Sequence, residues 1–198
     1  MISRRAALGQ LGALALAACD KADPRPGQDW ADQIRWREDL RQFEGPGLQV
    51  VRNWDFAASL HGFVADGAEL RHQPGVGAEL VSQSGDPKLR SPTGIDLPGA
   101  MANLVLVRMV RAVAAGPWDG ALYYATETHG ESAAHMALPV ETWPPETANP
   151  VTLVYDMTHP ARGGEDWTRH RISQLRLDTE AAPDGRVLIA QIALAHRD

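Results

Sequence analysis

From Leu48 onward, glycine and proline interrupt the chain about every ten residues, and short runs rich in valine, isoleucine and aromatic residues lie between them. Runs of this length are short for helices but suit strands, and regular turn signals of this kind are typical of an antiparallel β-sandwich. The sequence therefore predicts an all-β domain. The expected strands cover 48–52, 59–65, 78–83, 103–115, 121–128, 133–140, 151–157, 171–178 and 186–196.

Two of these runs are apolar at nearly every position. The run 103–115 has four valines between Val105 and Val113, and β-branched residues favour a strand over a buried helix. The closing run, 187–195, is equally apolar. A strand that is apolar on both faces must be covered on both faces, so we expect a further element to lie outside the sandwich.

The segment before the first strand supplies a candidate for this cover. Asp29 can cap a helix, and large apolar residues follow it at helical spacing. These residues are Trp30, Ile34, Trp36, Leu40 and Phe43. The pattern predicts a short helix over 29–43, which the Gly-Pro-Gly sequence at 45–47 ends.

The first eighteen residues have the composition of an export signal: a short cationic start, an apolar stretch and small residues at the end. Leu16-Ala17-Ala18-Cys19 resembles the lipobox of bacterial lipoproteins, which implies that Cys19 is acylated after the signal is cleaved. Ser3-Arg4-Arg5 with Leu8 resembles a twin-arginine export signal, although an ordinary basic start that holds two arginines is the alternative. Asp20 resembles the signal that retains some lipoproteins at the inner membrane.

The charge and the cysteine content limit which partners the protein can bind and which disulfides it can form. The net charge is −6 overall, and loss of the signal leaves 17 basic and 25 acidic side chains, with no basic cluster to attract nucleic acid. The acidic surface that results is repelled by anionic headgroups, so we expect the acyl chains to make the membrane contact. The single Cys excludes an internal disulfide.

The order of the runs resembles the galactose-binding-like jelly-roll modules of bacterial carbohydrate-binding proteins. The resemblance extends from Trp54 to His196 and is most specific at the end of the chain, where Trp167, Ile172, Leu175-Arg-Leu-Asp178 and a glycine turn precede the closing strand. Other parts of it are Trp54-Asp-Phe56, His61-Gly-Phe63, Asp66-Gly67, Gly85-Asp-Pro-Lys-Leu89, Val105-Leu-Val-Arg-Met109 and Ala121-Leu-Tyr-Tyr-Ala-Thr126. The resemblance implies a jelly-roll β-sandwich that binds carbohydrate without catalysis.

Sugar recognition needs an aromatic face for the pyranose ring and polar groups for its hydroxyls. Tyr123, Glu127 and His129 share one face of the expected strand 121–128, and Arg108 is a charge within an apolar run, which needs a partner or a solvated cleft. We expect these four residues to line one cleft, with Trp118 or Trp143 at its rim. The alternative is structural, with a paired arginine and tyrosines packed in the core.

Metal binding and hydrolysis are weaker interpretations of the same region. Glu127, His129, Glu131 and His135 provide enough donors for zinc only if they converge, and no tight metal-binding spacing is present. Modules of the resembled type often hold a structural calcium, for which the candidate ligands are Asp156, Glu165 and Asp166 near His159 and His170. No spacing identifies a pair of catalytic carboxylates, and no Gly-x-Ser-x-Gly sequence occurs.

The sequence thus divides into a cleaved signal (1–18), a lipid-anchored tether with a short helix (19–47) and a jelly-roll domain (48–198). We expect a non-catalytic, carbohydrate-binding lipoprotein of the bacterial envelope that faces the periplasm. The alternative is an interaction or assembly subunit of an envelope polysaccharide system that has no sugar site of its own.

Overall fold

The structure, a computed structural model, describes residues 30–141 and 144–198. The residues expected to direct export and anchoring (Arg4, Arg5, Cys19 and Asp20) and the expected rim residue Trp143 lie outside the described residues. The elements in chain order are η1 (Ala31–Gln33), β1 (Arg35–Arg37), β2 (Gln42–Glu44), β3 (Leu48–Asp55), β4 (Val64–Asp66), β5 (Ala68–Gln73), β6 (Gly77–Ser82), β7 (Lys88–Arg90), β8 (Leu97–Pro98), η2 (Gly99–Met101), β9 (Leu104–Val113), β10 (Leu122–Thr126), β11 (Met136–Ala137), β12 (Pro150–Asp156), α1 (Asp166–Arg169), β13 (Arg171–Asp178) and β14 (Arg186–Arg197). None of the described helices has the length and hydropathy that a membrane span requires.

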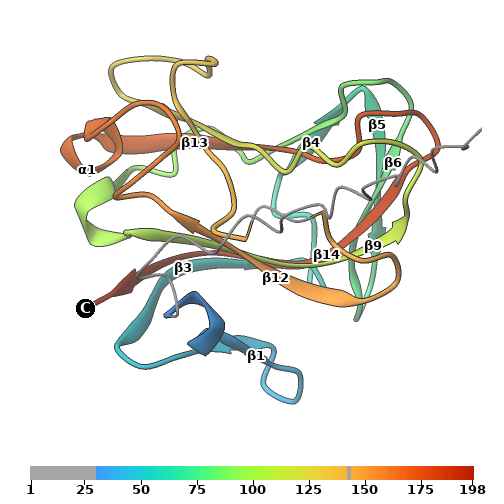
Figure 1. Cartoon of the computed structure of the whole chain (residues 1–198), viewed down its shortest axis with the longest axis horizontal. Helices are drawn as coiled ribbons and strands as arrows, with labels where there is room; N and C mark the ends of the chain where they lie inside the picture. Colours follow the sequence, from blue (N-terminus) through green and yellow to red (C-terminus); the bar gives the residue numbers. More distant parts are fainter. Residues whose placement is uncertain (1–29, 142–143) are drawn as a thin grey trace, which may run out of the picture.

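The strands form two stacked sheets, which confirms the expected all-β jelly-roll sandwich (Figure 1). The upper sheet of Figure 1 has the order β11-β10-β13-β7-β4, with β8 paired to β13. The lower sheet has the order β12-β9-β14-β6-β5, with β3 paired to β14. Each ladder between the described strands is antiparallel, and the main core lies between the two sheets.

The two apolar runs become the central strands of the lower sheet. β14 pairs with β9 along nearly its whole length, from Arg186 opposite Val113 to Ala195 opposite Leu104. Val105 and Val107 point into the main core, whereas Leu104 and Leu106 point to the outside of the sandwich and are equally buried. The expectation of a strand covered on both faces is therefore confirmed.

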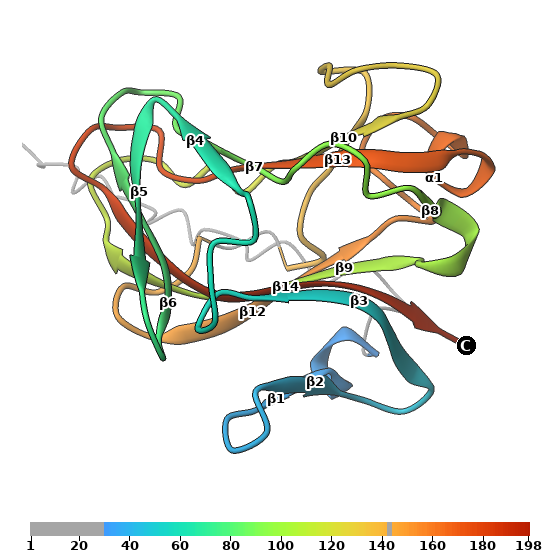
Figure 2. The ribbon, with the colours of Figure 1, turned by 180° about the vertical axis from the view of Figure 1, so that it is seen from behind.

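The cover on the outer face comes from the expected segment, but not as a helix. The helix predicted over 29–43 is wrong: residues 31–33 form a single 3-10 turn, and β1 and β2 form a hairpin in which Trp36 lies opposite Phe43 (Figure 2). The two rings pack edge to face with centroids 5.1 Å apart. Spacing along the chain fits a helix equally well, so the tertiary contacts decide the conformation.

Contacts from the sandwich hold the hairpin turn. Arg41 takes a left-handed backbone conformation at φ 47°, and its guanidinium forms a bidentate pair with Asp55 at 2.7 and 3.1 Å. The Gln191 side chain also donates to the Arg41 carbonyl oxygen at 3.1 Å. A helix over this segment would break these contacts with β3 and β14.

The hairpin and the outer face of the lower sheet form a second core. Its buried members are Ala31, Ile34, Phe43, Leu104, Leu106, Val154, Ala193 and Ala195. Residues 30–47 therefore pack on the sandwich as part of the same folded body.

The remaining differences concern short strands. β5 and β7 were not expected, because their sequences are polar and only pairing with β6 and β13 reveals them as strands. The strand expected over 133–140 is only two residues long, Met136–Ala137, because residues 127–135 form a loop.

Trp167, in α1, closes the α1 end of the sandwich. It is fully buried, and its indole donates to the Gly99 and Ala102 carbonyl oxygens at 3.1 and 2.7 Å.

The packing of the hairpin is open to a direct test. We expect Phe43→Ala to lower the free energy of unfolding by about 3 kcal/mol, because it removes a buried ring from the second core. Leu40→Ala, in the same hairpin but 53% exposed, is the matched control and should change stability by less than about 0.5 kcal/mol. Urea unfolding measures both, and equal effects would contradict the hairpin's role as a cover.

Candidate functional site

The structure does not bring the expected site residues into one cleft. Arg108 lies on β9 of the lower sheet, whereas Tyr123 lies on β10 of the upper sheet. The residues on either side of each belong to the main core, so both side chains point outward and the core separates them. Figure 2 shows β9 and β10 in the two sheets. Glu127 and His129 follow β10 in the loop at the α1 end, away from both.

Trp118 has a structural environment. It packs against the main core, and the Arg111 guanidinium lies 5.7 Å from its ring centroid. Arg111 in turn forms a buried ion pair with Glu180, with Nη2 and Oε2 2.9 Å apart, and donates to the Gly116 carbonyl oxygen at 2.7 Å. The charge of Arg111 is thus matched within the fold.

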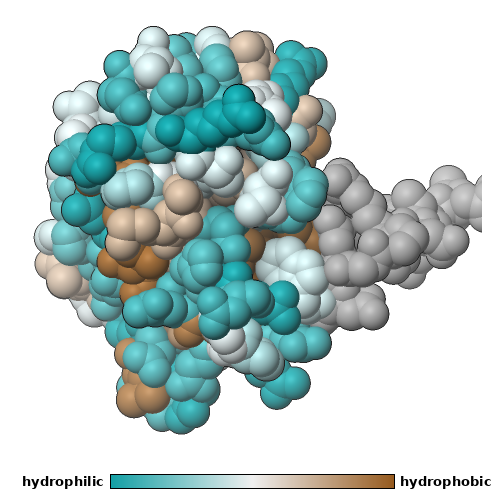
Figure 3. Space-filling view, turned by 90° about the vertical axis from the view of Figure 1, so that its left-hand side faces the viewer, coloured by the Kyte–Doolittle hydropathy of each residue, from teal (hydrophilic) through white to brown (hydrophobic). Residues whose placement is uncertain are grey.

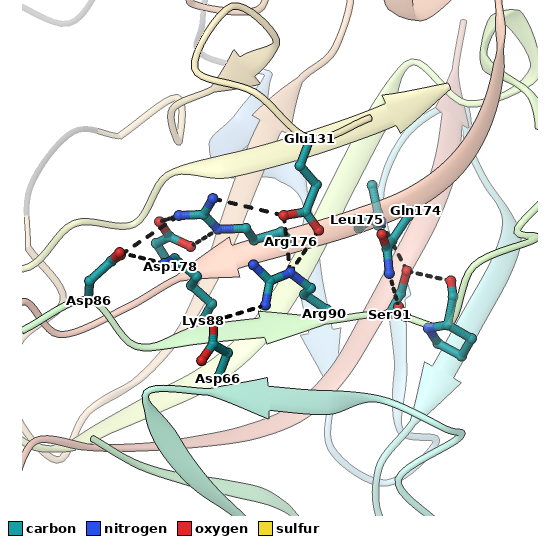
Figure 4. Close-up of polar contacts among 11 residues, drawn as sticks. Asp66, Asp86, Lys88, Arg90, Ser91, Glu131, Gln174, Leu175, Arg176 and Asp178 are labelled. Carbon is teal, nitrogen blue, oxygen red and sulfur yellow. Dashed lines mark hydrogen bonds and ion pairs between the residues drawn. The ribbon is translucent and has the colours of Figure 1, made fainter. Parts of the chain in front are cut away.

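Tyr123 lies beside a network of charged residues on the upper sheet. Figure 4 shows the charged residues of this network. The Arg176 guanidinium lies 4.3 Å from the Tyr123 ring centroid and pairs with Asp178, with Nε and Oδ1 2.7 Å apart. Arg90 pairs with Glu131 at 2.9 Å, and Lys88 with Asp86 at 2.5 Å. Burial raises the pKa of the Asp178 carboxyl, and Arg176 opposes this effect.

On this face of the upper sheet, the charged side chains neutralise one another. Each cation named above has a carboxylate partner on the same face, and a guanidinium occupies one side of the only aromatic ring in the network. The charges of such a surface are already satisfied within the fold. These contacts indicate a structural surface.

Glu127 and His129 join a cluster of histidines. His129 Nε2 lies 2.8 Å from Asp166 Oδ2, and its ring stacks on His135 with centroids 3.6 Å apart. Burial disfavours the charged form of His129, but Asp166 and the Gly130 carbonyl outweigh this effect and raise the pKa. Glu127 lies 3.4 Å from His170, so this cluster contains two of the expected site residues.

Arg108 lines one of the clefts beside the hairpin. We call it the Arg108 cleft; it has a volume of about 370 Å³ and lies between the hairpin and the outer face of β9 and β12. Its lining includes Asp32, Ile34, Trp36, Arg108, Glu141 and Thr152. A second hollow of about 330 Å³ shares Trp36, Arg108 and Pro150 with it, so the two adjoin at these side chains.

Among the described residues, Arg108 lacks the kind of carboxylate partner that the other buried arginines have. In the part of the chain that the structure describes, no carboxylate oxygen lies within 4.0 Å of its guanidinium and no hydrogen bond from it is recorded. Its nearest specific contact is the Trp36 ring, with a centroid 5.9 Å from Cζ. Burial lowers the pKa of Arg108, which only the charge of Glu38 opposes.

The opposite wall of the cleft carries two carboxyl groups. Partial burial and a hydrogen bond with Asp32 raise the pKa of Glu141, so this carboxyl holds its proton to a higher pH than usual. The cleft thus combines a guanidinium with unused donors, a carboxyl pair and an indole wall. Such a combination of a hollow with a few convergent polar groups is typical of small-molecule sites.

Sequence reasoning identified Arg108 but missed its aromatic neighbour. Its spacing in the sequence predicts Trp36 on the buried face of a helix, whereas the hairpin leaves it partly exposed over β9. The sequence signal that was available is Arg35-Trp36-Arg37, in which charged neighbours on both sides favour an alternating strand. Asp32 and Glu141 could not be paired from sequence because 108 residues separate them.

Comparison with known proteins does not establish a function for this chain. No family model and no curated protein matches the chain. Similar solved structures include a point mutant of CBM29-2, a family 29 carbohydrate-binding module, complexed with cellulohexaose (12% identity, 75% of this chain and 89% of that chain, TM-score 0.46). Others are a family 29 module (13%, 73% and 90%, TM-score 0.45) and a CBM29-2 mutant complexed with mannohexaose (13%, 76% and 82%, TM-score 0.42).

The assignment of Arg111 to a structural role can be tested. We expect Glu180→Gln to lower the free energy of unfolding by about 3 to 5 kcal/mol, because it leaves the Arg111 charge buried without a counter-charge. Glu69→Gln removes the carboxylate of an exposed ion pair with Arg71 and should leave the urea midpoint unchanged. A small effect for Glu180→Gln would show that water reaches Arg111.

Proposed function

We propose that this protein is a lipid-anchored, non-catalytic carbohydrate-binding protein whose ligand occupies the Arg108 cleft. The observation that carries the proposal is the Arg108 guanidinium, which lies half-buried beside an indole ring with no carboxylate partner among the described residues. A buried charge without a partner is unfavourable, so a polar ligand would provide what the fold does not.

The chemistry of the cleft fits a sugar. Trp36 offers a flat apolar wall for one face of a pyranose ring, and Arg108, Thr152 and the carboxyl pair offer donors and acceptors for its hydroxyls. The second hollow continues past Trp36 and Arg108, which suits a chain of more than one sugar unit.

The same geometry favours binding over hydrolysis. A glycosidase holds its two carboxyl groups about 5 to 9 Å apart on either side of the scissile bond. Asp32 and Glu141 instead lie close enough for Asp32 to raise the pKa of Glu141, so they do not flank a bond in this way. The pair is suited to accept and donate hydrogen bonds to a bound hydroxyl.

The alternative role as an assembly subunit requires a contiguous apolar patch. The large exposed hydrophobic residues are scattered over separate elements: Leu40, Val50, Val64, Val76, Met101, Val113 and Leu138. Figure 3 shows hydrophobic side chains (brown) in several separate areas on the face at the α1 end. This distribution favours the carbohydrate-binding role.

The anchor belongs to the same proposal. Acylation at Cys19 after export through the twin-arginine signal would place the domain in the bacterial envelope, facing the periplasm, with Asp20 directing inner-membrane retention. Ten residues lie between Cys19 and Trp30, so the two are at most about 40 Å apart. The hairpin that forms one wall of the cleft follows this tether directly, so the site would remain near the membrane surface.

The ligand site can be tested by calorimetric titration with cellohexaose and mannohexaose after a glycan-array screen. We expect Arg108→Met and Trp36→Ala each to weaken binding at least tenfold, because they remove the cleft's charge and its aromatic wall. Tyr123→Ala, on the opposite face, is the matched control and should bind as the parent does. Binding lost in Tyr123→Ala but retained in Arg108→Met would move the site to the upper sheet, and no binding to any glycan would refute the proposal.

Lipidation is tested separately by labelling bacteria that express the full chain with a fatty acid. We expect Cys19→Ser to abolish the label and to move the protein from the membrane fraction to the soluble fraction, because the acyl chains provide the anchor. A label that persists in Cys19→Ser would exclude Cys19 as the acylated residue, whatever the result of the sugar titration.

A further inference from the structure

We propose that His129, His135 and Asp166 form a binding site for a divalent metal ion of the zinc class, at the α1 end of the sandwich and independent of the Arg108 cleft. One donor atom from each residue lies within 4.8 Å of the other two. Among the described residues this is the only group of three such donors that converges in this way. The carboxylates expected to hold calcium do not join it as a set, since Asp156 pairs with His159 and Glu165 with Arg169.

The three residues come from two segments that the fold brings together. His129 and His135 lie in the loop between β10 and β11, and Asp166 is the first residue of α1. Figures 1 and 2 show this loop (yellow) and α1 (orange) at the same end of the molecule. An ion held by all three would therefore link the loop to α1.

The hydrogen bonds of His129 point to a cation. Nδ1 lies 2.9 Å from the Gly130 carbonyl oxygen, which can only accept, so Nδ1 carries a proton. Nε2 then directs either a lone pair or a second proton toward Asp166 Oδ2, 2.8 Å away. A lone pair facing a carboxylate is repulsive, so at this separation a proton lies between the two atoms. A metal ion replaces this proton when the two atoms move apart to about 3.3 Å. The bond from Nδ1 to a backbone carbonyl is the outer contact that metal-binding histidines usually have.

His135 is placed to complete the set. Its ring stacks on that of His129, with planes 12° apart, and Nδ1 lies 3.2 Å from the Ser132 hydroxyl. This contact leaves Nε2 for a metal ion. Donor atoms around a tetrahedral zinc lie about 3.3 Å apart, given bonds of about 2.0 to 2.1 Å. His129 Nε2 and Asp166 Oδ2 lie 2.8 Å apart and all three donors lie within 4.8 Å of one another, so side-chain rotations would bring the set to that spacing.

A buried hydroxyl beside the cluster provides an independent sign of a missing partner. Tyr124 is fully buried, and its ring lies 5.9 and 5.7 Å from those of His129 and His135. Burial and the nearby Asp166 carboxylate raise the Tyr124 pKa to about 12, yet its hydroxyl makes no hydrogen bond of ordinary geometry among the described residues. Buried hydroxyls are rarely left without a partner. A water molecule in the open position of the metal would give this hydroxyl a partner.

Gly163 keeps this space free of side chains. A Cβ atom at Gly163 would lie 2.4 Å from the Tyr124 hydroxyl oxygen and 3.3 Å from His135 Cδ2, and its backbone has φ +110°. Only glycine fits both conditions. A further layer surrounds the donors, because His170 lies 3.6 Å from Asp166 Oδ1 and 3.4 Å from Glu127.

The donor set selects the class of metal. Two imidazoles and one carboxylate suit zinc and related transition metals, whereas calcium prefers oxygen ligands alone. Three protein ligands leave a fourth position for water or another molecule. The competing explanation is a doubly protonated His129 in an ordinary ion pair with Asp166, which has the same geometry and binds no metal.

The test uses the full chain after treatment with a chelator. We expect one equivalent of Co²⁺ to give the visible absorption of a tetrahedral site, and Zn²⁺ to displace it and to raise the melting temperature. His135→Gln and Asp166→Asn should weaken Zn²⁺ binding at least tenfold in calorimetry, with circular dichroism used to confirm that each variant is folded. His159→Ala, whose side chain is 80% exposed, is the matched control and should bind as the parent does.

The proposal is overturned if a folded parent chain binds neither ion, which would leave the protonated His129 as the explanation. It is also overturned if His135→Gln and Asp166→Asn bind Zn²⁺ as tightly as the parent, because the ion would then lie elsewhere. Should either variant fail to fold, His135→Ala and His129→Gln provide the same comparison. Sugar binding at the Arg108 cleft is a separate measurement and does not affect either outcome.

Discussion

The pairing of β14 with β9 is the constraint on which the rest of this structure depends. Both strands are apolar on both faces, so the sheet they form is stable in water only when each face is covered. The upper sheet covers one face and creates the main core, and the β1–β2 hairpin covers the other and creates the second. The hairpin is therefore part of the folding unit, although it precedes the sandwich in sequence.

This arrangement also explains where a ligand site can form. The hairpin covers the outer face of β9 only in part, and Arg108 lies where the cover ends and the cleft begins. Elsewhere the fold neutralises its partly buried cations: Arg111 pairs with Glu180, and Arg176 with Asp178. The contrast between matched and unmatched charge, and not the number of polar residues, distinguishes the Arg108 cleft from the more polar surface of the upper sheet.

At the α1 end the fold also brings polar side chains together, here imidazoles and a carboxylate. Trp167 anchors α1 to η2 through two indole hydrogen bonds, which fixes Asp166 opposite the loop that carries His129 and His135. Two histidine rings, a carboxylate and a buried tyrosine hydroxyl are thus assembled at one end of the sandwich, about a rigid indole. The cleft and this cluster lie on different elements, so a ligand at one need not alter the other.

The sequence by itself determined the all-β class, the central strands β9 and β14 and the segment that covers them, because runs of β-branched residues and their apolar faces are local properties. It could not decide that residues 35–44 form a hairpin, because their spacing suits a helix equally and contacts of Arg41 with Asp55 and Gln191 select the turn. Nor could it show that Arg108 and Tyr123 face opposite sides of the molecule. Face alternation is set within each strand, but only long-range pairing assigns a strand to a sheet and thereby brings side chains such as His129 and Asp166 together.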